Sequence, residues 1–341
     1  MYLKYLYEHK YKYGEILNKF FNIEGKQSIT TIARYLGVDP STIIKYIKLF
    51  KRMGFTFGID IAYARLGLRR VYIFTNKKVK LISNRQKFQV FLKTFARSLC
   101  PSGYFIAYYI PWDVSVESFV ERFATNNYWI VEETHGSKPD LIKYNIPPQK
   151  EEDLIKVLNE VIKACNRYKK EKPPTTSRSK LNSIDLTVIK ELEKNYFTKL
   201  TDIARRSNIP YHRILARMKK INSYIECIRV NETPWTRDVN QLIVAIMSMK
   251  PGLPLRSIAD ILCRLPMIGN VNISWHSNSL ILLTLPDLKN MFILLDNLVS
   301  VGIAKRYSTY LIEYPFKSYT LPYKVGVEYN KYQKKWNTFI V

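Results

Sequence analysis

The sequence lacks the features of a membrane, secreted or metal-binding protein. No apolar run approaches the roughly 20 residues that a spanning helix requires. The N-terminal segment MYLKYLYEHKYKYGEI is too charged for the apolar core of a secretory signal. The four cysteines are far apart and form no CxxC pair, so reduced thiols are the default. These absences predict a cytoplasmic protein with no membrane partner.

Signatures of common enzyme classes are also missing. No glycine-rich loop could hold a phosphate, and no nucleophile elbow is present. The four histidines have no metal-ligand spacing, and no set of carboxylates suggests a metal-dependent nuclease. Glu132-Glu133 with His135 is the one acidic cluster beside a histidine, and we interpret it as a solvated strand end. The sequence therefore predicts no enzyme, no cofactor and no metal.

Positive charge is what the chain has in excess. It contains 54 Lys and Arg residues against 28 Asp and Glu residues, a formal net charge of +26. A field of this size attracts polyanions, and the usual one is nucleic acid. An acidic membrane surface is the competing partner. The length of 341 residues suggests about two domains, and a hydrophobic content of 47% is typical of globular proteins.

Residues 28–52 predict two short helices joined by a tight turn. Ser28 is a good N-cap, Gly37 suits a left-handed helix end, and Asp39-Pro40 starts the next helix. The expected buried face of the second helix comprises Ile43, Ile44, Ile47 and Phe50. Its expected DNA-contacting residues are Ser41, Thr42, Lys45, Lys48, Lys51 and Arg52. Hydroxyls followed by cations fit a DNA major groove and its phosphates, although an ordinary helical hairpin has a similar basic face.

The same pattern returns in residues 199–221. Ile32-Ala33 corresponds to Ile203-Ala204, an offset of 171 residues, and Asn208 takes the turn position. The expected DNA-contacting residues of this copy are Tyr211, His212, Arg213, Arg217, Lys219 and Lys220. Each copy follows an amphipathic helical segment, so the sequence predicts a duplicated three-helix unit.

A wing is expected after each helix pair. Alternating apolar residues from Phe55 to Ile61 predict a strand, and a basic turn follows it. The residues of that turn are Arg65, Gly67, Arg69 and Arg70, of which we expect Arg69 and Arg70 to contact DNA. In the second copy the region is 224–230, and the residues at or beyond its tip are Arg229, Trp235 and Arg237.

The rest of the second copy has an interpretable element order. Strands are predicted at 241–249, 271–275, 280–285 and 305–314, and helices at 255–265 and 287–301. This βαββαβ order is that of the ferredoxin-like sandwich. In the first copy, strands are predicted near 71, at 104–110 and at 129–133, and helices at 85–98 and 114–125. One strand is short or missing there, which indicates a degenerate copy.

A winged helix followed by a βαββαβ domain resembles the Lrp/AsnC family of archaeal and bacterial transcription regulators. The resemblance rests on residues 28–52, the IDIAYARLGL segment and the element order. In that family the sandwich domain mediates dimerisation and can bind small effectors such as amino acids. The resemblance therefore implies a homodimer and a small-molecule effector as partners, although this chain carries two copies where the family usually has one.

The sequence thus predicts an α+β fold of two tandem units, each a winged helix-turn-helix followed by a ferredoxin-like α/β sandwich, with a degenerate first copy. The predicted segments are 1–70 and 183–238 (winged helices), 71–164 and 239–316 (sandwiches), 165–182 (basic linker) and 317–341 (basic aromatic tail).

The predicted function is a sequence-specific transcription regulator that binds double-stranded DNA at the nucleoid through both recognition helices, as an intramolecular pseudo-dimer. A replication initiator or copy-control protein is one alternative. A protein-interaction module built on winged helices is another, and exposed apolar residues on the recognition helices would favour it.

Overall fold

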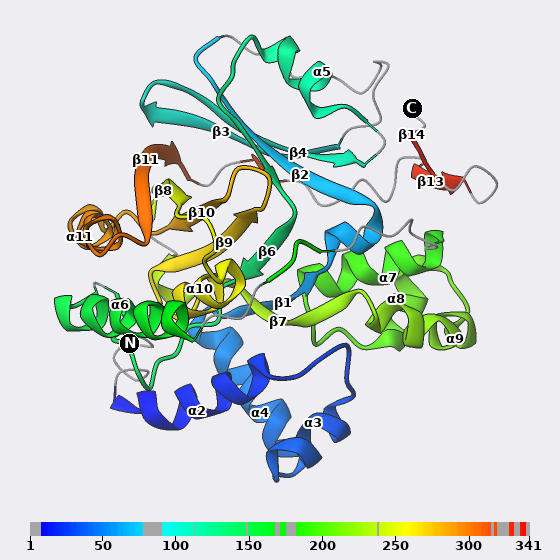
Figure 1. Ribbon diagram of the computed structural model, residues 1–341. Helices are drawn as coiled ribbons and strands as arrows, with labels where there is room; N and C mark the ends of the chain where they lie inside the picture. Colours follow the sequence, from blue (N-terminus) through cyan, green and yellow to red (C-terminus); the bar gives the residue numbers. More distant parts are fainter. Residues whose placement is uncertain are drawn as a thin grey trace.

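The computed structural model describes residues 8–77, 91–112, 114–147, 149–167, 171–174, 182–236, 239–314, 317–318, 327–330 and 335–338. Helices and strands alternate in two similar series, which gives a mixed α+β fold (Figure 1). We call residues 8–167 the first half and residues 182–314 the second half. No helix in the described ranges is both long and apolar enough to cross a membrane.

The first half begins with three helices and a strand. These elements are α2 (Lys10–Phe21), α3 (Ile29–Leu36), α4 (Pro40–Met53) and β1 (Thr56–Ile61). Ser28 accepts a hydrogen bond from the backbone N–H of Thr31, and Gly37 has a φ of 67°, so both predicted ends of α3 are confirmed. The predicted burial of Ile44 is wrong, because the buried stripe of α4 runs through Ile43 and Ile47 and leaves Ile44 44% exposed.

The second half begins in the same way. Its first elements are α7 (Ser183–Lys194), α8 (Leu200–Ser207), α9 (Tyr211–Asn222) and β7 (Ile225–Glu232). β1 and β7 pair antiparallel, with Gly58 opposite Arg229 and Ile59 opposite Ile228. Arg229 is also the residue that corresponds to Gly58 at the repeat offset of 171 residues, so equivalent positions of the two halves lie opposite each other. The two helical units are therefore related by a pseudo-twofold axis through this pair, which supports an internal duplication.

The predicted basic wing does not form in the first half. β1 pairs with the other half, the chain makes a 3-10 turn at Tyr63–Leu66, and β2 (Leu68–Thr75) enters the main sheet. Arg70 is only 7% exposed on β2, and Arg69 donates to the carbonyl of Val114. The wing prediction is wrong because the alternating residues of β2 continue the sheet. Arg237 lies outside the described residues.

The main sheet repeats one strand order in both halves. In the first half the order is β5 (Tyr128–Val131), β2, β4 (Gly103–Pro111) and β3 (Phe91–Cys100). In the second half it is β11 (Ala304–Glu313), β8 (Gln241–Met249), β10 (Ser279–Thr284) and β9 (Ile268–Ser274). β3 pairs with β11, and β9 pairs with β6 (Glu133–Gly136). β5 and β6 are the two edge strands of this order, and Glu132 alone separates them along the chain. The two edges are therefore continuous, and the sheet is closed.

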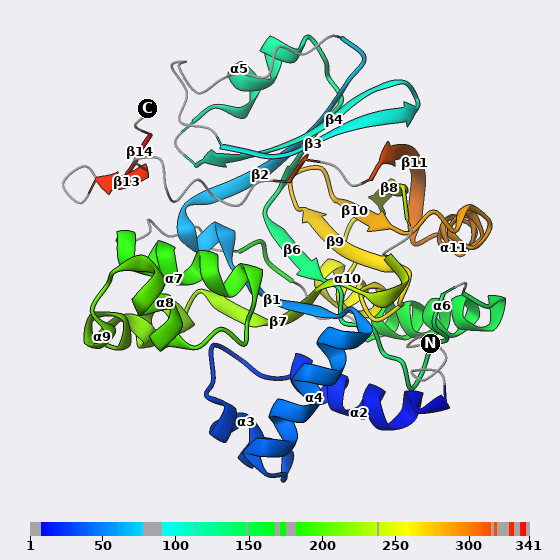
Figure 2. The same cartoon turned by 180° about the vertical axis from the view of Figure 1, so that it is seen from behind.

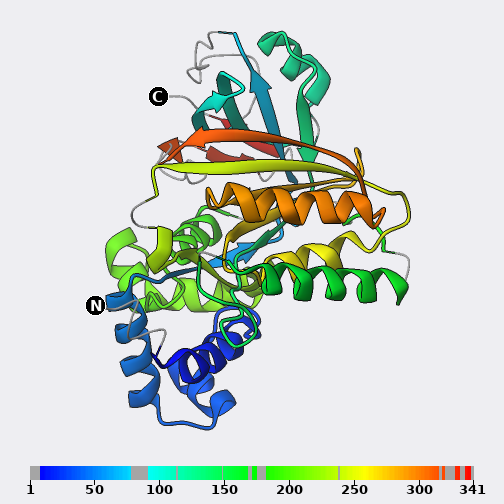
Figure 3. The ribbon, with the colours of Figure 1, turned by 90° about the vertical axis from the view of Figure 1, so that its left-hand side faces the viewer.

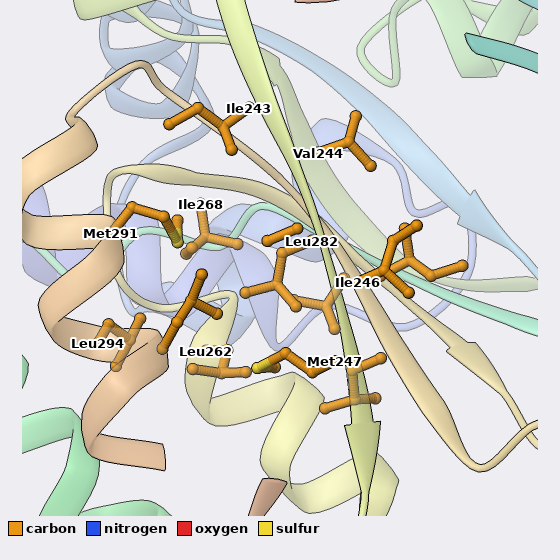
Figure 4. Close-up of a cluster of buried hydrophobic side chains, with 14 of the residues drawn as sticks. Ile243, Val244, Ile246, Met247, Leu262, Ile268, Leu282, Met291 and Leu294 are labelled. Atoms are coloured by element: carbon orange, nitrogen blue, oxygen red, sulfur yellow. The ribbon is translucent and has the colours of Figure 1, made fainter. Parts of the chain in front are cut away.

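Helices cover the outside of this closed sheet. The covering helices are α5 (Val116–Val120), α6 (Glu151–Asn166), α10 (Leu255–Leu262) and α11 (Leu288–Ser300). Figure 3 shows α11 and α6 running beneath β8 and β11, while α5 lies on the far side of the first half (Figure 2). Figure 4 shows a cluster of buried side chains in the second half, where Met291 of α11 lies beside Ile268 of β9 and Leu262 of α10 lies beside Met247 of β8.

One predicted helix is a strand. Residues 91–100 form β3, which pairs with β4 so that Phe95 lies opposite Ile106, and residues 85–90 lie outside the described ranges. Pairing with neighbouring strands overrides the helical pattern of this segment. The predicted strands and helices of the second half are confirmed, and Asp287 caps α11 by accepting from the backbone N–H of Asn290.

Candidate functional site

A cavity of about 400 Å³ lies inside the closed sheet, at the end that faces β7. Side chains of both halves line it, among them Arg70, Tyr72, Phe105, Leu242 and Val244. The volume corresponds to about a dozen water molecules and is in the range of small-molecule sites. A closed sheet of about this strand number is just wide enough to hold one small ligand.

Arg70 lines this cavity with a positive charge that faces tyrosine rings and hydrogen-bond acceptors and has no acidic partner among the described residues. Its Nη1 donates to the hydroxyl of Tyr72 and to Oδ1 of Asn272, both at 3.1 Å. Its Nη2 donates to the hydroxyl of Tyr109 at 2.8 Å. The buried Nε has no hydrogen-bond partner, and no acidic side chain of the described ranges forms an ion pair with Arg70.

The surroundings of Arg70 keep its guanidinium charged. Burial by itself lowers the pKa of Arg70, but the oxygens of Tyr109, Tyr72 and Tyr63 outweigh burial and raise the pKa above its ordinary value. A buried charge without a counter-ion is costly. A bound anion would remove that cost, and a carboxylate matches the planar fork of a guanidinium.

Arg229 also lines the cavity but has an acidic partner. Its Nη1 lies 3.5 Å from Oδ1 of Asp60, and its Nε donates to Oδ1 of Asn231 at 3.0 Å. Asp60 is 3% exposed and also accepts from the backbone N–H of Gly136 at 2.9 Å. Burial lowers the pKa of Arg229, whereas Asp60 raises it, with a net rise. The charge of Arg229 is therefore compensated within the protein.

Ionisable groups continue behind Arg70. The hydroxyl of Tyr63 donates to Oε1 of Glu193 at 2.5 Å, and the Tyr63 ring stacks on Tyr109 with ring centroids 4.7 Å apart. Burial, followed by the charge of Glu193, raises the pKa of Tyr63 well above its ordinary value. Arg70 thus connects the cavity to a buried tyrosine pair and a carboxylate.

A second charged group links β6 to α10 outside the cavity. Nδ1 of His135 lies 2.7 Å from Oδ1 of Asp260, and its Nε2 lies 3.9 Å from Glu133. Glu133 accepts from Arg256 Nε at 2.7 Å and from Trp275 Nε1 at 2.8 Å. The interpretation of Glu133 and His135 as a solvated strand end is wrong, because both are paired and about 15% exposed. No three side chains of the described ranges are grouped to hold a metal ion.

We expect this group to make stability fall as pH rises from 6.5 to 9. Burial lowers the pKa of His135, but Asp260 and Glu133 outweigh it and raise the pKa from 6.5 to about 9. Because the folded state holds the proton more tightly, the stabilisation is complete below pH 6.5 and is lost as pH rises through 9. The shift corresponds to roughly 3 kcal/mol.

Urea unfolding of the wild type and His135→Gln across this range measures the effect. Burial raises the pKa of Glu132 to about 7. Titration of Glu132 therefore changes the free energy of unfolding mainly below pH 7, so the two proteins are compared above pH 7. The substitution should flatten the pH dependence. An unchanged slope in His135→Gln would assign the effect to other groups.

The residues predicted to contact DNA lie mainly on α4 and α9, away from the cavity. The exposed ones are Ser41, Lys45, Lys48, Lys51, Arg52, Tyr211, His212, Arg213 and Lys219, and the half-buried ones are Thr42, Arg217 and Lys220. Arg217 donates from Nε to Oδ1 of Asp185 at 2.7 Å. Arg69, Arg70 and Arg217 are therefore engaged by the protein itself.

The sequence prediction missed the cavity, although one signal was present. Arg70 and Tyr72 alternate with Val71 and Ile73 in a segment of otherwise strand-forming residues. This alternation places Arg70 on the same face of a strand as Tyr72. The predicted wing would instead have placed Arg70 in solvent.

Comparisons with known proteins give a limited likeness. No family model matches the chain, and no curated protein matches it. A solved structure of the siroheme decarboxylase NirDL is 12% identical, covers 91% of this chain and 95% of its own, and has a TM-score of 0.45. A second, of NirDL in co-complex with an iron-uroporphyrin III analogue, is 11% identical, covers 89% and 91%, and has a TM-score of 0.43. At these values neither activity nor ligand is carried over to this chain.

The prediction of a DNA-binding transcription regulator is contradicted, as is the prediction that the chain is no enzyme. The solved structures reported above are of a siroheme decarboxylase and not of a DNA-binding regulator. In this chain the expected wing is absent, and Arg70 lies inside the protein. The replication initiator and the protein-interaction module, which we considered as alternatives, are not retained as functions, although Ile44 on α4 and Leu215 on α9 are exposed apolar residues.

Proposed function

We propose that this protein is an enzyme whose substrate is a small molecule with a carboxylate, bound by Arg70 in the cavity of the closed sheet. The observation that carries the proposal is the buried guanidinium of Arg70, which lines the cavity and, among the residues that the structure describes, has no acidic partner and keeps an unpaired Nε. A charge of this kind is unfavourable in the empty protein and becomes favourable when a carboxylate binds.

The groups behind Arg70 favour an enzyme over a passive carrier. Strongly shifted ionisable groups beside a cavity are typical of active sites. Here Tyr63 and Glu193 share a short hydrogen bond, and Tyr109 contacts both the Tyr63 ring and the Arg70 guanidinium. Tyr63 and Glu193 do not line the cavity themselves, so the pair would hold a proton behind Arg70, the residue that contacts the substrate.

We also infer the finer architecture. Each half is interpreted as a helix-turn-helix unit followed by a ferredoxin-like sandwich. The equal strand orders, the βαββαβ series of the second half and the pseudo-twofold pairing of β1 with β7 support this interpretation. The predicted homodimer and the predicted small-molecule effector both stay predictions, and we propose a carboxylate as the ligand of the cavity.

Calorimetric titration with matched pairs of ligands tests the carboxylate site. The probes are linear alkanoates and aryl carboxylates, each compared with its primary amide, which keeps the shape and removes the charge. We expect the carboxylates to bind roughly ten- to a hundredfold more tightly, because a hydrogen bond to a charged group contributes about 1.5–3 kcal/mol. Equal binding of acids and amides, or no binding of any acid, would overturn the proposed site.

A further inference from the structure

The geometry points to a substrate that carries a second, uncharged polar group, a hydroxyl or carbonyl, which binds Thr233 while the carboxylate binds Arg70. An apolar body connects the two groups. This inference rests on the proposed function and adds the class of substrate to it. Thr233 becomes the residue that selects among carboxylates.

Two buried polar atoms of the cavity lining have no hydrogen-bond partner in the described part of the chain. One is Nε of Arg70, and the other is Oγ1 of Thr233, a residue that is 5% exposed. A buried hydroxyl without a partner costs about as much as a lost hydrogen bond. Native proteins rarely leave such groups unsatisfied, so an unsatisfied pair in one cavity indicates the polar positions of its ligand.

The turn that carries Thr233 is fixed before any ligand binds. The hydroxyl of Thr236 donates to the carbonyl of Thr233 at 2.7 Å and accepts from the Thr233 N–H at 3.3 Å. Thr236 thus satisfies the backbone of Thr233 and leaves its side-chain hydroxyl for another partner. A prearranged hydroxyl costs little entropy when it binds.

Apolar and aromatic side chains provide the surface for the body of the ligand. The indole N–H of Trp235 donates to the carbonyl of Pro266 at 3.0 Å, and its ring packs edge-on against Phe55 with centroids 5.6 Å apart. With its polar atom satisfied, Trp235 presents an apolar ring to the cavity. Phe105 and Leu242 extend this apolar lining.

Charges at the lining set the direction of binding. Glu232 is exposed and lines the cavity next to Thr233, where its charge repels an anion. Arg229 is paired with Asp60, so Arg70 is the arginine of the lining for which the described residues provide no acidic partner. The carboxylate therefore binds at Arg70, and the uncharged group binds at Thr233.

Calorimetry with linear ω-hydroxyalkanoates and the parent alkanoates, each in a series of increasing chain length, tests this inference. At the length that spans the two groups, we expect the ω-hydroxyl to tighten binding about three- to tenfold. Thr233→Val, which replaces the hydroxyl by a methyl group, should abolish this gain, so that the ω-hydroxyalkanoate and its parent alkanoate bind the variant equally. Thr233→Ser keeps the hydroxyl and should retain the gain.

The outcomes separate this inference from the proposed function. If alkanoates bind better than their amides but no ω-hydroxyl of any length improves binding, the second polar group is wrong and the carboxylate site stands. The same conclusion follows if Thr233→Val keeps the full gain. If alkanoates bind no better than amides, the proposed function itself fails. Circular dichroism of each variant confirms that the comparison is made on folded protein.

Discussion

Arg70→Met is expected to abolish carboxylate binding while leaving the unliganded protein at least as stable as the wild type. The substitution removes a buried charge that has no acidic partner in the described part of the chain, and methionine fills a similar volume with apolar atoms. The hydroxyls of Tyr72 and Tyr109 lose a donor, but Thr134 still donates to Oδ1 of Asn272 at 2.9 Å. We expect the free energy of unfolding to stay within about 1 kcal/mol of the wild type, on the stabilising side. Carboxylate affinity should fall roughly a hundredfold.

The matched control is Arg229→Met. This substitution leaves Asp60, which is 3% exposed, without its ion-pair partner. Removing one partner of a buried pair is strongly destabilising, so we expect a loss of about 3 kcal/mol. Urea unfolding and calorimetric titration of both variants measure stability and binding. If Arg70→Met is as destabilised as Arg229→Met, Arg70 is a structural residue and the cavity loses its main argument.

Arg217→Met is expected to lower the free energy of unfolding by about 3 kcal/mol. Arg217 on α9 makes an ion pair with Asp185 on α7, whose side chain is fully buried. The same carboxylate accepts from the backbone N–H of Asn182 at 2.9 Å, so Asp185 cannot turn to solvent without losing a helix cap. The substitution would leave the buried carboxylate of Asp185 without this ion pair, while the backbone N–H of Asn182 still donates to it.

Arg213→Met on the same helix is the control for Arg217→Met. Arg213 is exposed, and surface substitutions of this kind change stability by about 0.5 kcal/mol or less. Chemical denaturation of both variants under identical conditions gives the comparison. Equal stability of the two variants would show that the ion pair of Arg217 with Asp185 contributes nothing to the free energy of unfolding.

Local signals were sufficient for the helices that begin each half. Ser28 caps α3, Gly37 and Asn208 adopt left-handed backbone conformations, and Pro40 begins α4, because each depends on side-chain chemistry close in sequence. The repeat is visible for the same reason, since helix spacing and turn residues recur at one offset. The element order of the second half also follows from short-range periodicity.

Long-range pairing was not predictable from the same signals. The segment at 91–100 has no clean alternation, and its strand character comes from β4 and β11 on either side. The cavity depends on closure of the sheet, which brings Arg70 to Asn272, far away in the sequence. A basic residue beside an apolar run was interpreted as solvent-exposed because exposure is the common case for arginine. The cost of burying Arg70 becomes visible only once its neighbours are known.

The two walls of the cavity come from halves that are related by a pseudo-twofold axis but differ in sequence, so the walls are chemically different. Thr75 of β2 lies opposite the second residue of β4, and Met247 of β8 lies opposite the second residue of β10, so Thr75 and Met247 are equivalent positions. Arg70 and Leu242 each precede these positions by five residues and are therefore equivalent as well. Both residues line the cavity. A pair of identical subunits would present the same group from both walls, and an asymmetric molecule could then enter in two equivalent orientations. Duplication within one chain removes that degeneracy, because a cation on one wall and an aliphatic side chain on the other admit a single orientation.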